Sequence, residues 1–354
     1  VRTIQQGLNV GLLGTTVVNT STQLDGTGIG IAVVDSGVRD DHRSFVDASG
    51  NKRVTYKIDF SGSTISEPDR YGHGTHVASL AAGGGGQNLD VADGLHVSNY
   101  RGVAPNAKII SVRVLNENGV GSAARLISAL DWIYNNRTTH NIRVVNLSLG
   151  AAAIESWRND PLCRAVRKLT AAGIVVVAAA GNNGKTADGQ KLYGAIHSPG
   201  NDPSVITVGA TNTFGTDARN DDGIATYSSR GPTRSFYTDS TGVKRYDHLI
   251  KPDLVAPGNK IVAAKAKDSS WLITNNPSLM TTEMNRTGED NDVMFLSGTS
   301  MSTPMASGAA ALLFQMNPKL TPTMVKMILE YTAQPLNGVN MLEQGAGQLN
   351  IEGA

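Results

Sequence analysis

The stretch Leu296-Ser297-Gly298-Thr299-Ser300-Met301-Ser302-Thr303-Pro304 leads into an apolar, alanine-rich run that continues to Met316. This pattern predicts a helix with Pro304 in its first turn, where the missing donor would have no partner anyway. The unpaired N–H groups of a helix N-terminus favour negative charge, so Ser300 occupies a position that suits a nucleophile. Gly298 would let another backbone segment approach closely. An isolated serine is more often an N-cap that opens a core helix, so other parts of the chain must decide whether Ser300 is a nucleophile or an N-cap.

Short apolar runs alternate with amphipathic segments through the middle of the chain. The runs predict buried strands at residues 31–34, 108–115, 143–147, 174–180 and 205–210. Helices are predicted around Leu126, Leu130 and Ile133, from Asp160 to Gly173, and near residues 322–331. This alternation predicts an α/β fold, a three-layer sandwich with a mostly parallel central sheet and helices on both faces.

Four residues stand just past the carboxyl ends of predicted strands, where parallel sheets place their ligand sites: Asp35, Gly119, Leu149 and Asn182. His73 lies between two glycines at a predicted helix entrance, and its imidazole can exchange a proton near neutral pH. This convergence favours a catalytic Ser300 over an N-cap.

Other chemistries fit the sequence less well. The glycines of residues 26–30 precede a strand instead of following one, which excludes the dinucleotide-binding motif. His73 and His76 lack the zinc spacing, and we interpret His76 as structural. Cys163 is the only cysteine, so an intrachain disulfide or a thiolate metal cluster is excluded; we interpret it as a packing residue.

The amino-acid composition argues against some classes of binding partner. The 354 residues are 40% hydrophobic, enough for a large core, and 31 basic against 30 acidic residues leave a net charge of +1. That balance gives no electrostatic reason to expect nucleic acid or an anionic membrane as a partner. The longest apolar runs are shorter than the roughly eighteen residues that a membrane span needs. A start at Val1 with no initiator Met suggests a processed mature chain or a trimmed one.

Asp35, His73, Ser300 and Asn182 supply the parts of an acyl-transfer enzyme. Ser300 would attack a carbonyl, His73 would take and return its proton, and Asp35 would hold the imidazole tautomer. The Asn182 amide and the Ser300 N–H would stabilise the oxyanion.

The chain resembles the subtilisin-like serine proteases (subtilases). Five motifs in register carry the resemblance, in the order Asp, His, Ser. They are Val33-Val34-Asp35-Ser36-Gly37, His73-Gly74-Thr75-His76-Val77-Ala78, Asn146-Leu147-Ser148-Leu149-Gly150, Ala179-Ala180-Gly181-Asn182 and Gly298-Thr299-Ser300-Met301-Ser302-Thr303-Pro304.

The resemblance implies a secreted serine endopeptidase made with an inhibitory N-terminal propeptide. We expect one catalytic domain over residues 1–354, with loop insertions at about 84–100, 233–249 and 269–292. We also expect a monomer that acts on proteins and peptides and needs no cofactor for its chemistry.

The resemblance also assigns substrate contacts. Two segments would sandwich the peptide as an added strand, which implies broad specificity: Gly119, Val120 and Gly121, and Ser148, Leu149 and Gly150. The pocket for the residue before the scissile bond would be lined by the Ser148 region, Ala179 and Gly181. His197 aligns with the glycine that usually floors this pocket, and we hypothesise that it shortens or polarises the floor; a surface-loop histidine is the alternative.

Structural calcium is an open expectation. Ser44 stands where several relatives carry an aspartate ligand, which argues against calcium there. Two acidic groups could hold a cation or simply be solvated: Asp217, Asp221 and Asp222, and Glu289, Asp290 and Asp292.

Two rival functions remain. A serine esterase or lipase would have Gly-x-Ser-x-Gly and the order Ser, Asp, His, neither of which this chain has. A binding module on an inactive protease fold would lack a catalytic residue, and none is missing here.

Overall fold

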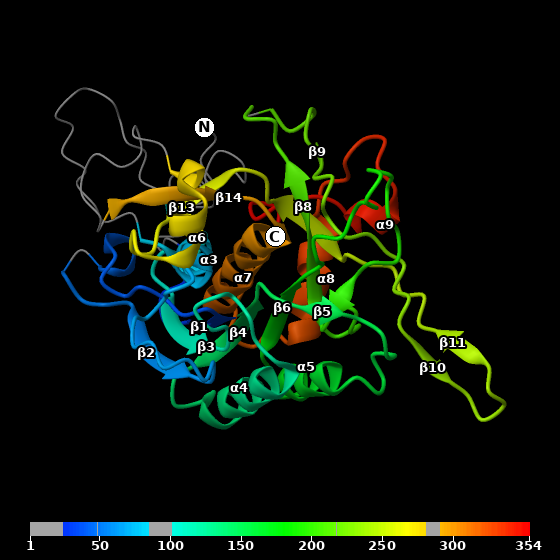
Figure 1. The fold of residues 1–354 in the computed structure, drawn as a ribbon, viewed down its shortest axis with the longest axis horizontal. Helices are drawn as coiled ribbons and strands as arrows, with labels where there is room; N and C mark the ends of the chain where they lie inside the picture. Colours follow the sequence, from blue (N-terminus) through cyan, green and yellow to red (C-terminus); the bar gives the residue numbers. More distant parts are fainter. Residues whose placement is uncertain (1–23, 48, 85–100, 217, 281–290) are drawn as a thin grey trace.

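The computed structural model describes residues 24–47, 49–84, 101–216, 218–280 and 291–354. Within these ranges, an eight-stranded sheet forms the centre of the molecule (Figure 1). Its main path runs through β12 (Leu254–Pro257), β8 (Ile206–Asn212), β6 (Val175–Ala179), β4 (Ile142–Leu147), β1 (Gly30–Asp35), β3 (Lys108–Arg113) and β2 (Val54–Asp59). All neighbours along this path are parallel, and β9 (Gly223–Ile224) is antiparallel to β8.

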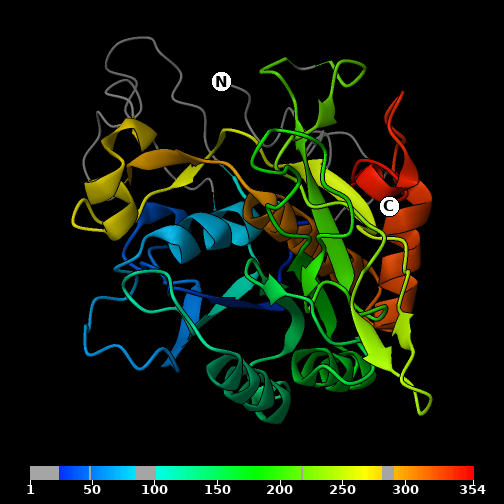
Figure 2. The ribbon, with the colours of Figure 1, turned by 45° about the vertical axis from the view of Figure 1, so that its right-hand side comes forward.

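Helices cover both faces of the sheet, as Figure 2 shows. On one face lie α3 (His73–Ala82), α7 (Thr299–Met316) and α8 (Pro322–Thr332); on the other lie α4 (Ala123–Asn136) and α5 (Pro161–Ala171). The side chains of β1 alternate between the two cores, with Ile31 and Val33 in the first and Ala32 and Val34 in the second. Strands buried on both faces read as continuous apolar runs, which is why the sequence predicted them. The three-layer α/β fold is confirmed.

Helix α7 differs from its predicted start. It begins at Thr299, so Pro304 is its sixth residue and lies beyond the first turn, contrary to the prediction. A proline there leaves the carbonyl of Ser300 without its usual intrahelical donor. The hydroxyl of Ser148 donates to that carbonyl instead, at 2.8 Å. This hydrogen bond from Ser148, which directly follows β4, reduces the free-energy cost of a proline inside the helix.

The predicted insertions have structure of their own. Residues 233–249 contain an antiparallel hairpin, β10 (Phe236–Thr238) and β11 (Lys244–Tyr246), which projects from the body in Figure 1. Residues 269–280 form α6 (Trp271–Asn275) and η2 (Pro277–Leu279) between the paired strands β13 (Ile261–Ala264) and β14 (Val293–Leu296). Most of the 84–100 insertion, and residues 281–290, lie outside the described residues.

Short elements complete the described chain: η1 (Arg43–Phe45), β5 (Ala151–Ala152), β7 (His197–Ser198) and α9 (Met341–Gln344). Strands from residue 30 to residue 257 join one sheet, which supports the proposed single catalytic domain. Among the helices that the structure describes, none is both long and apolar enough to cross a bilayer.

Candidate active site

The site lies at the carboxyl edge of the sheet. Strands β6, β4, β1 and β3 are consecutive neighbours, so their carboxyl ends lie side by side. Asp35 is the last residue of β1, and Asn182 follows the end of β6. His73 is the first residue of α3, and Ser300 is the second residue of α7. The topology therefore brings the four predicted residues toward one edge.

The side chains of His73 and Asp35 are hydrogen-bonded to each other. Nδ1 of His73 donates to Oδ1 of Asp35 at 2.8 Å, and the backbone N–H of Ser36 donates to the same oxygen at 2.8 Å. The Asp35 side chain is fully buried, whereas that of His73 is 17% exposed. Burial lowers the pKa of His73, but the charges of Asp35 and Asp69 and the bond to Asp35 outweigh it, and the pKa is raised. The hydrogen bond to Asp35 keeps the proton of neutral His73 on Nδ1, so Nε2 can accept a proton from a reacting group.

Ser300 and Ser148 form a reciprocal pair. The Ser300 hydroxyl donates to the Ser148 carbonyl at 3.0 Å, while the Ser148 hydroxyl donates to the Ser300 carbonyl. Within the described residues, no hydrogen bond joins the Ser300 hydroxyl to His73, and the Ser300 N–H donates to no protein atom. Catalytic bonds are often long before substrate binds, so this geometry leaves His73 a candidate base.

Asn182 caps helix α7. Its Oδ1 accepts from the backbone N–H of Thr299 at 2.9 Å and from the Thr299 hydroxyl at 3.1 Å. The N-cap residue is Gly298, which has no side chain to cap with, so the reading of Ser300 as an N-cap is wrong. A Cβ on Gly298 would lie 3.4 Å from Nδ2 of Asn182. The backbone approach expected at Gly298 is also present, because its N–H donates to the Gly258 carbonyl at 2.9 Å.

A cleft of about 470 Å³ runs beside His73. Its walls include both predicted substrate segments: Gly119, Val120 and Gly121, and Ser148, Leu149 and Gly150. Tyr71, which the sequence did not single out, also lines it. A Cβ on Gly119 would lie 2.4 Å from Cζ of Tyr71, so only glycine lets the loop and the ring pack together.

His197 lies between the two predicted pocket walls. A Cβ on Gly181 would come within 2.7 Å of its ring, and one on Gly150 within 3.1 Å of its Cβ. Nδ2 of Asn183 lies 3.0 Å from Nε2 of His197, and burial lowers the pKa of the ring. His197 is a half-buried residue of the two-residue strand β7, which pairs with β5. Ala179 is the last residue of β6 and is buried.

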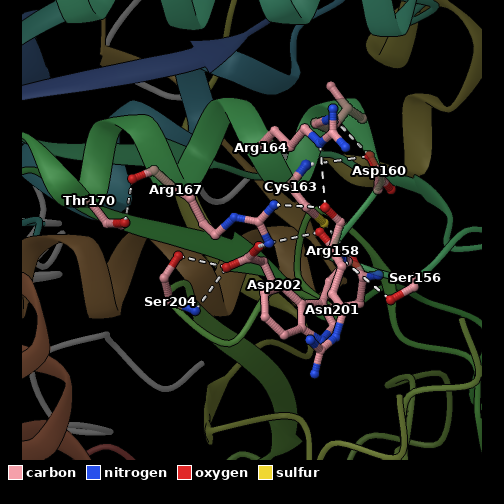
Figure 3. Close-up of polar contacts among 12 residues, drawn as sticks. Ser156, Arg158, Asp160, Cys163, Arg164, Arg167, Thr170, Asn201, Asp202 and Ser204 are labelled. Atoms are coloured by element: carbon pink, nitrogen blue, oxygen red, sulfur yellow. Dashed lines mark hydrogen bonds and ion pairs between the residues drawn. The ribbon is translucent and has the colours of Figure 1, made fainter. Parts of the chain in front are cut away.

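The other two candidates from the sequence have structural roles. Nε2 of the fully buried His76 lies 3.1 Å from the Ile261 carbonyl and 3.2 Å from that of Met294, and burial lowers its pKa to about 3. Sγ of Cys163 lies 3.2 Å from Oδ1 of Asn201 within the polar network of Figure 3. Burial raises the pKa of this thiol, which opposes nucleophilic reactivity. Both predictions are confirmed.

The described residues contain no cluster of three metal-ligating side chains. Asp221 accepts from the Thr216 hydroxyl, and Asp222 accepts from Nε2 of Gln348. Asp292 pairs with Nζ of the buried Lys265 at 2.8 Å. The remaining members of the two acidic groups, Asp217, Glu289 and Asp290, lie outside the described residues.

A buried arginine supports the region of Ser44. The Arg53 guanidinium, 7% exposed, donates to the carbonyls of Ser44, Ala82 and Ala107. Burial lowers its pKa to about 10, so it stays charged at neutral pH. Sequence reasoning missed Arg53 because its partners are three backbone oxygens that no motif encodes.

A His–Asp pair and a helix-borne serine at the edge of a three-layer α/β fold define a serine-hydrolase type of site. The family comparison specifies the class further: the subtilase family (peptidase S8) matches residues 26–350. The chain belongs to this family and is a serine endopeptidase that hydrolyses peptide bonds. Subtilases need no cofactor for this reaction.

Individual relatives agree with this assignment. The serine protease AprX of Bacillus subtilis (strain 168) is 35% identical over 342 residues, which cover 95% of this chain and 68% of AprX. The extracellular serine proteinase of Thermus sp. (strain Rt41A) is 33% identical, over 88% of this chain and 56% of that protein. The chain thus spans only part of these relatives. Among solved structures, Sphericase matches with a TM-score of 0.66 and 26% identity, covering 99% of each chain.

Proposed function

We propose that this endopeptidase works through a triad of Ser300, His73 and Asp35, with an oxyanion hole formed by Asn182 and the Ser300 N–H. The single observation that carries the proposal is the 2.8 Å bond between His73 and Asp35, at the sheet edge where α7 presents Ser300. The orientation of Asn182 supports it, since Oδ1 is occupied by Thr299 and Nδ2 makes no bond among the described residues.

The reaction follows from these roles. Ser300 Oγ gives up its bond to the Ser148 carbonyl and attacks the substrate carbonyl, while Nε2 of His73 takes the hydroxyl proton. Asp35 stabilises the imidazolium, and the two donors stabilise the oxyanion. His73 then returns the proton to the leaving amine, which leaves an acyl-enzyme. Water, deprotonated by His73, attacks the ester, the acyl–Oγ bond breaks to release the acid product, and His73 returns the proton to Ser300 Oγ.

Substrate would bind as an extended strand between the 119–121 and 148–150 segments. Main-chain pairing of this kind reads little side-chain information, which supports broad specificity. Selection would occur where the residue before the scissile bond meets His197. The ring position between Gly150 and Gly181 supports the hypothesis that His197 shortens or polarises the pocket.

The test is hydrolysis of a peptide amide by Ser300→Ala, for which we expect at least a roughly thousandfold loss of kcat. Ser302→Ala is the matched control, because this serine of the same helix donates to the Ala256 carbonyl in the core. Comparable losses in both variants would contradict the assignment. Activity on esters alone would favour an esterase, and a folded wild-type chain without activity would favour a binding module.

We also propose that the protease is secreted, monomeric and made with an inhibitory propeptide. A relative whose name calls it extracellular supports secretion. Expression of the full-length gene, with sequencing of the N-terminus of the product in the medium and size-exclusion chromatography, tests all three. Structural calcium stays a proposal, tested by the melting temperature with and without chelator.

A further inference from the structure

The loop before His73 contains a second buried carboxylate, Asp69, which is 2% exposed and which the proposed reaction does not use. It accepts four hydrogen bonds. Oδ1 accepts from the Ser36 hydroxyl and from the Gly72 N–H, both at 2.8 Å. Oδ2 accepts from the Thr75 N–H at 2.8 Å and from the Thr75 hydroxyl at 2.5 Å. All four acceptor positions of the carboxylate are therefore occupied.

These donors belong to two elements. Gly72 is the N-cap of α3 and Thr75 lies in its first turn, whereas Ser36 directly follows Asp35 at the end of β1. The Ser36 hydroxyl also accepts from the Gly74 N–H at 2.9 Å. In the first turn of the helix that begins with His73, Asp69 thus satisfies the Thr75 N–H directly and the Gly74 N–H through Ser36.

The two elements approach too closely for ordinary residues. A Cβ on Gly74 would lie 2.1 Å from the Gly37 carbonyl, and one on Gly37 would lie 1.7 Å from the Pro68 carbonyl. This close backbone contact is stable only while the buried polar groups between α3 and the end of β1 have hydrogen-bond partners. The His73–Asp35 bond spans this same junction.

We propose that Asp69 is a positioning residue, whose buried carboxylate joins the start of α3 to the end of β1 and thereby holds His73 against Asp35. The inference rests on the proposed function for its catalytic consequence. Its geometric part, the placement of His73, can be measured without turnover.

Several charged and titratable groups surround this junction. The charges of Asp35 and Asp69 act on His73 and on Tyr71, and the charge of His73 acts on His76. A small pocket next to Asp69 is also lined by Arg39, Asp40, Asp41, Glu67 and Lys267. Arg39 pairs with Asp41, Lys52 and Lys57 pair with Asp40, and Arg70 pairs with Glu67. Burial raises the pKa of Asp69 while its donors act in the opposite direction, and its charge raises the pKa of His73.

Asp69→Asn is the first test. An amide presents NH₂ to one pair of donors, so it leaves the N–H of either Gly72 or Thr75 without an acceptor. A displacement of about 1 Å can cost on the order of 10²-fold, so we expect a fall in kcat of that size with little change in KM. Loss of the negative charge also lowers the pKa of His73, so the acid limb of kcat/KM moves to lower pH.

Asp202→Asn is the matched control. Asp202 is buried and accepts from the Ser204 N–H at 2.9 Å and hydroxyl at 2.6 Å, and it pairs with Arg167 of α5 (Figure 3). We expect this variant to lose stability but to keep the pH profile. If Asp69→Asn keeps kcat within threefold and the same acid limb, or if Asp202→Asn moves that limb equally, the inference is overturned.

Thr75 provides a test if Asp69→Asn does not fold. Thr75→Val removes one donor to Asp69, and we expect a roughly tenfold lower kcat that Thr75→Ser restores; an unchanged Thr75→Val would overturn the inference. An NMR titration of the His73 ring is independent of turnover. A lower pKa of His73 in Thr75→Val, which keeps the Asp69 charge, supports the positioning role even if the wild-type protein hydrolyses no peptide, whereas an unchanged pKa of His73 in this variant contradicts it.

Discussion

Asn182 has two roles that a pair of substitutions can separate. Its Oδ1 caps helix α7 through Thr299, and its Nδ2 is the proposed oxyanion donor. Asn182→Ala removes both, so we expect a loss of about 1 kcal/mol in the free energy of unfolding. The same variant should lose about 10²- to 10³-fold in kcat, or roughly 2.7 to 4 kcal/mol of transition-state stabilisation.

Asn182→Asp removes only the donor. The carboxylate still accepts from Thr299, and negative charge at a helix N-terminus is favourable by about 0.3 to 1 kcal/mol. We therefore expect this variant to be at least as stable as the wild type. It should lose at least about 10³-fold in kcat, because a negative charge then faces the developing oxyanion.

The assay combines kcat on a peptide amide with urea unfolding. Asn340→Ala is the matched control, because Asn340 caps α9 by accepting from the Leu342 N–H at 2.9 Å. It should lose stability without losing kcat. An Asn182→Asp enzyme within tenfold of the wild-type kcat would refute the oxyanion assignment, and a strongly destabilised one would refute the capping assignment.

Three further predictions concern other parts of the molecule. Since the pKa of His73 is raised above its ordinary value of 6.5 and the base must be neutral, kcat/KM should fall as the pH drops, with a midpoint above 6.5; a midpoint at or below 6.5 would contradict this. Arg53→Met removes the guanidinium donors from three buried carbonyls, of which only that of Ser44 keeps another donor among the described residues, the Gly84 N–H. The variant should cost about 2 to 4 kcal/mol in urea unfolding, whereas a loss below about 0.5 kcal/mol would refute its structural role. His197→Gly should shift cleavage of a peptide library toward larger side chains before the scissile bond; an unchanged profile would reject the pocket hypothesis.

The sequence predicted the strands that position the site because they are buried on both faces and read as unbroken apolar runs. It did not predict β2, whose residues are mostly exposed at the sheet edge. It also missed β12, a four-residue strand that ends in a proline and reads as a loop. Each strand forms because its backbone hydrogen-bonds to a neighbour that is distant in the chain: β12 to β8, and β2 to β3.

Side-chain geometry was harder to predict than the identity of the candidate residues. The motifs point to Asp35 and His73, and the structure brings this pair to hydrogen-bonding distance. No motif indicates that Asn182 holds Thr299, or that Asp69 gathers donors from two elements. Such contacts depend on hydrogen bonds between segments that only the finished fold brings together, so a local pattern does not contain them.

The proline within α7 links the two sides of the proposed active site. Pro304 frees the carbonyl of Ser300 from the helix, and Ser148 binds both the carbonyl and the hydroxyl of that residue. Ser148 also begins the segment along which a peptide would align. A peptide aligned along this segment would therefore contact the same residue that holds both the carbonyl and the hydroxyl of Ser300. A proline in one helix thus connects the proposed peptide-binding segment to the proposed nucleophile.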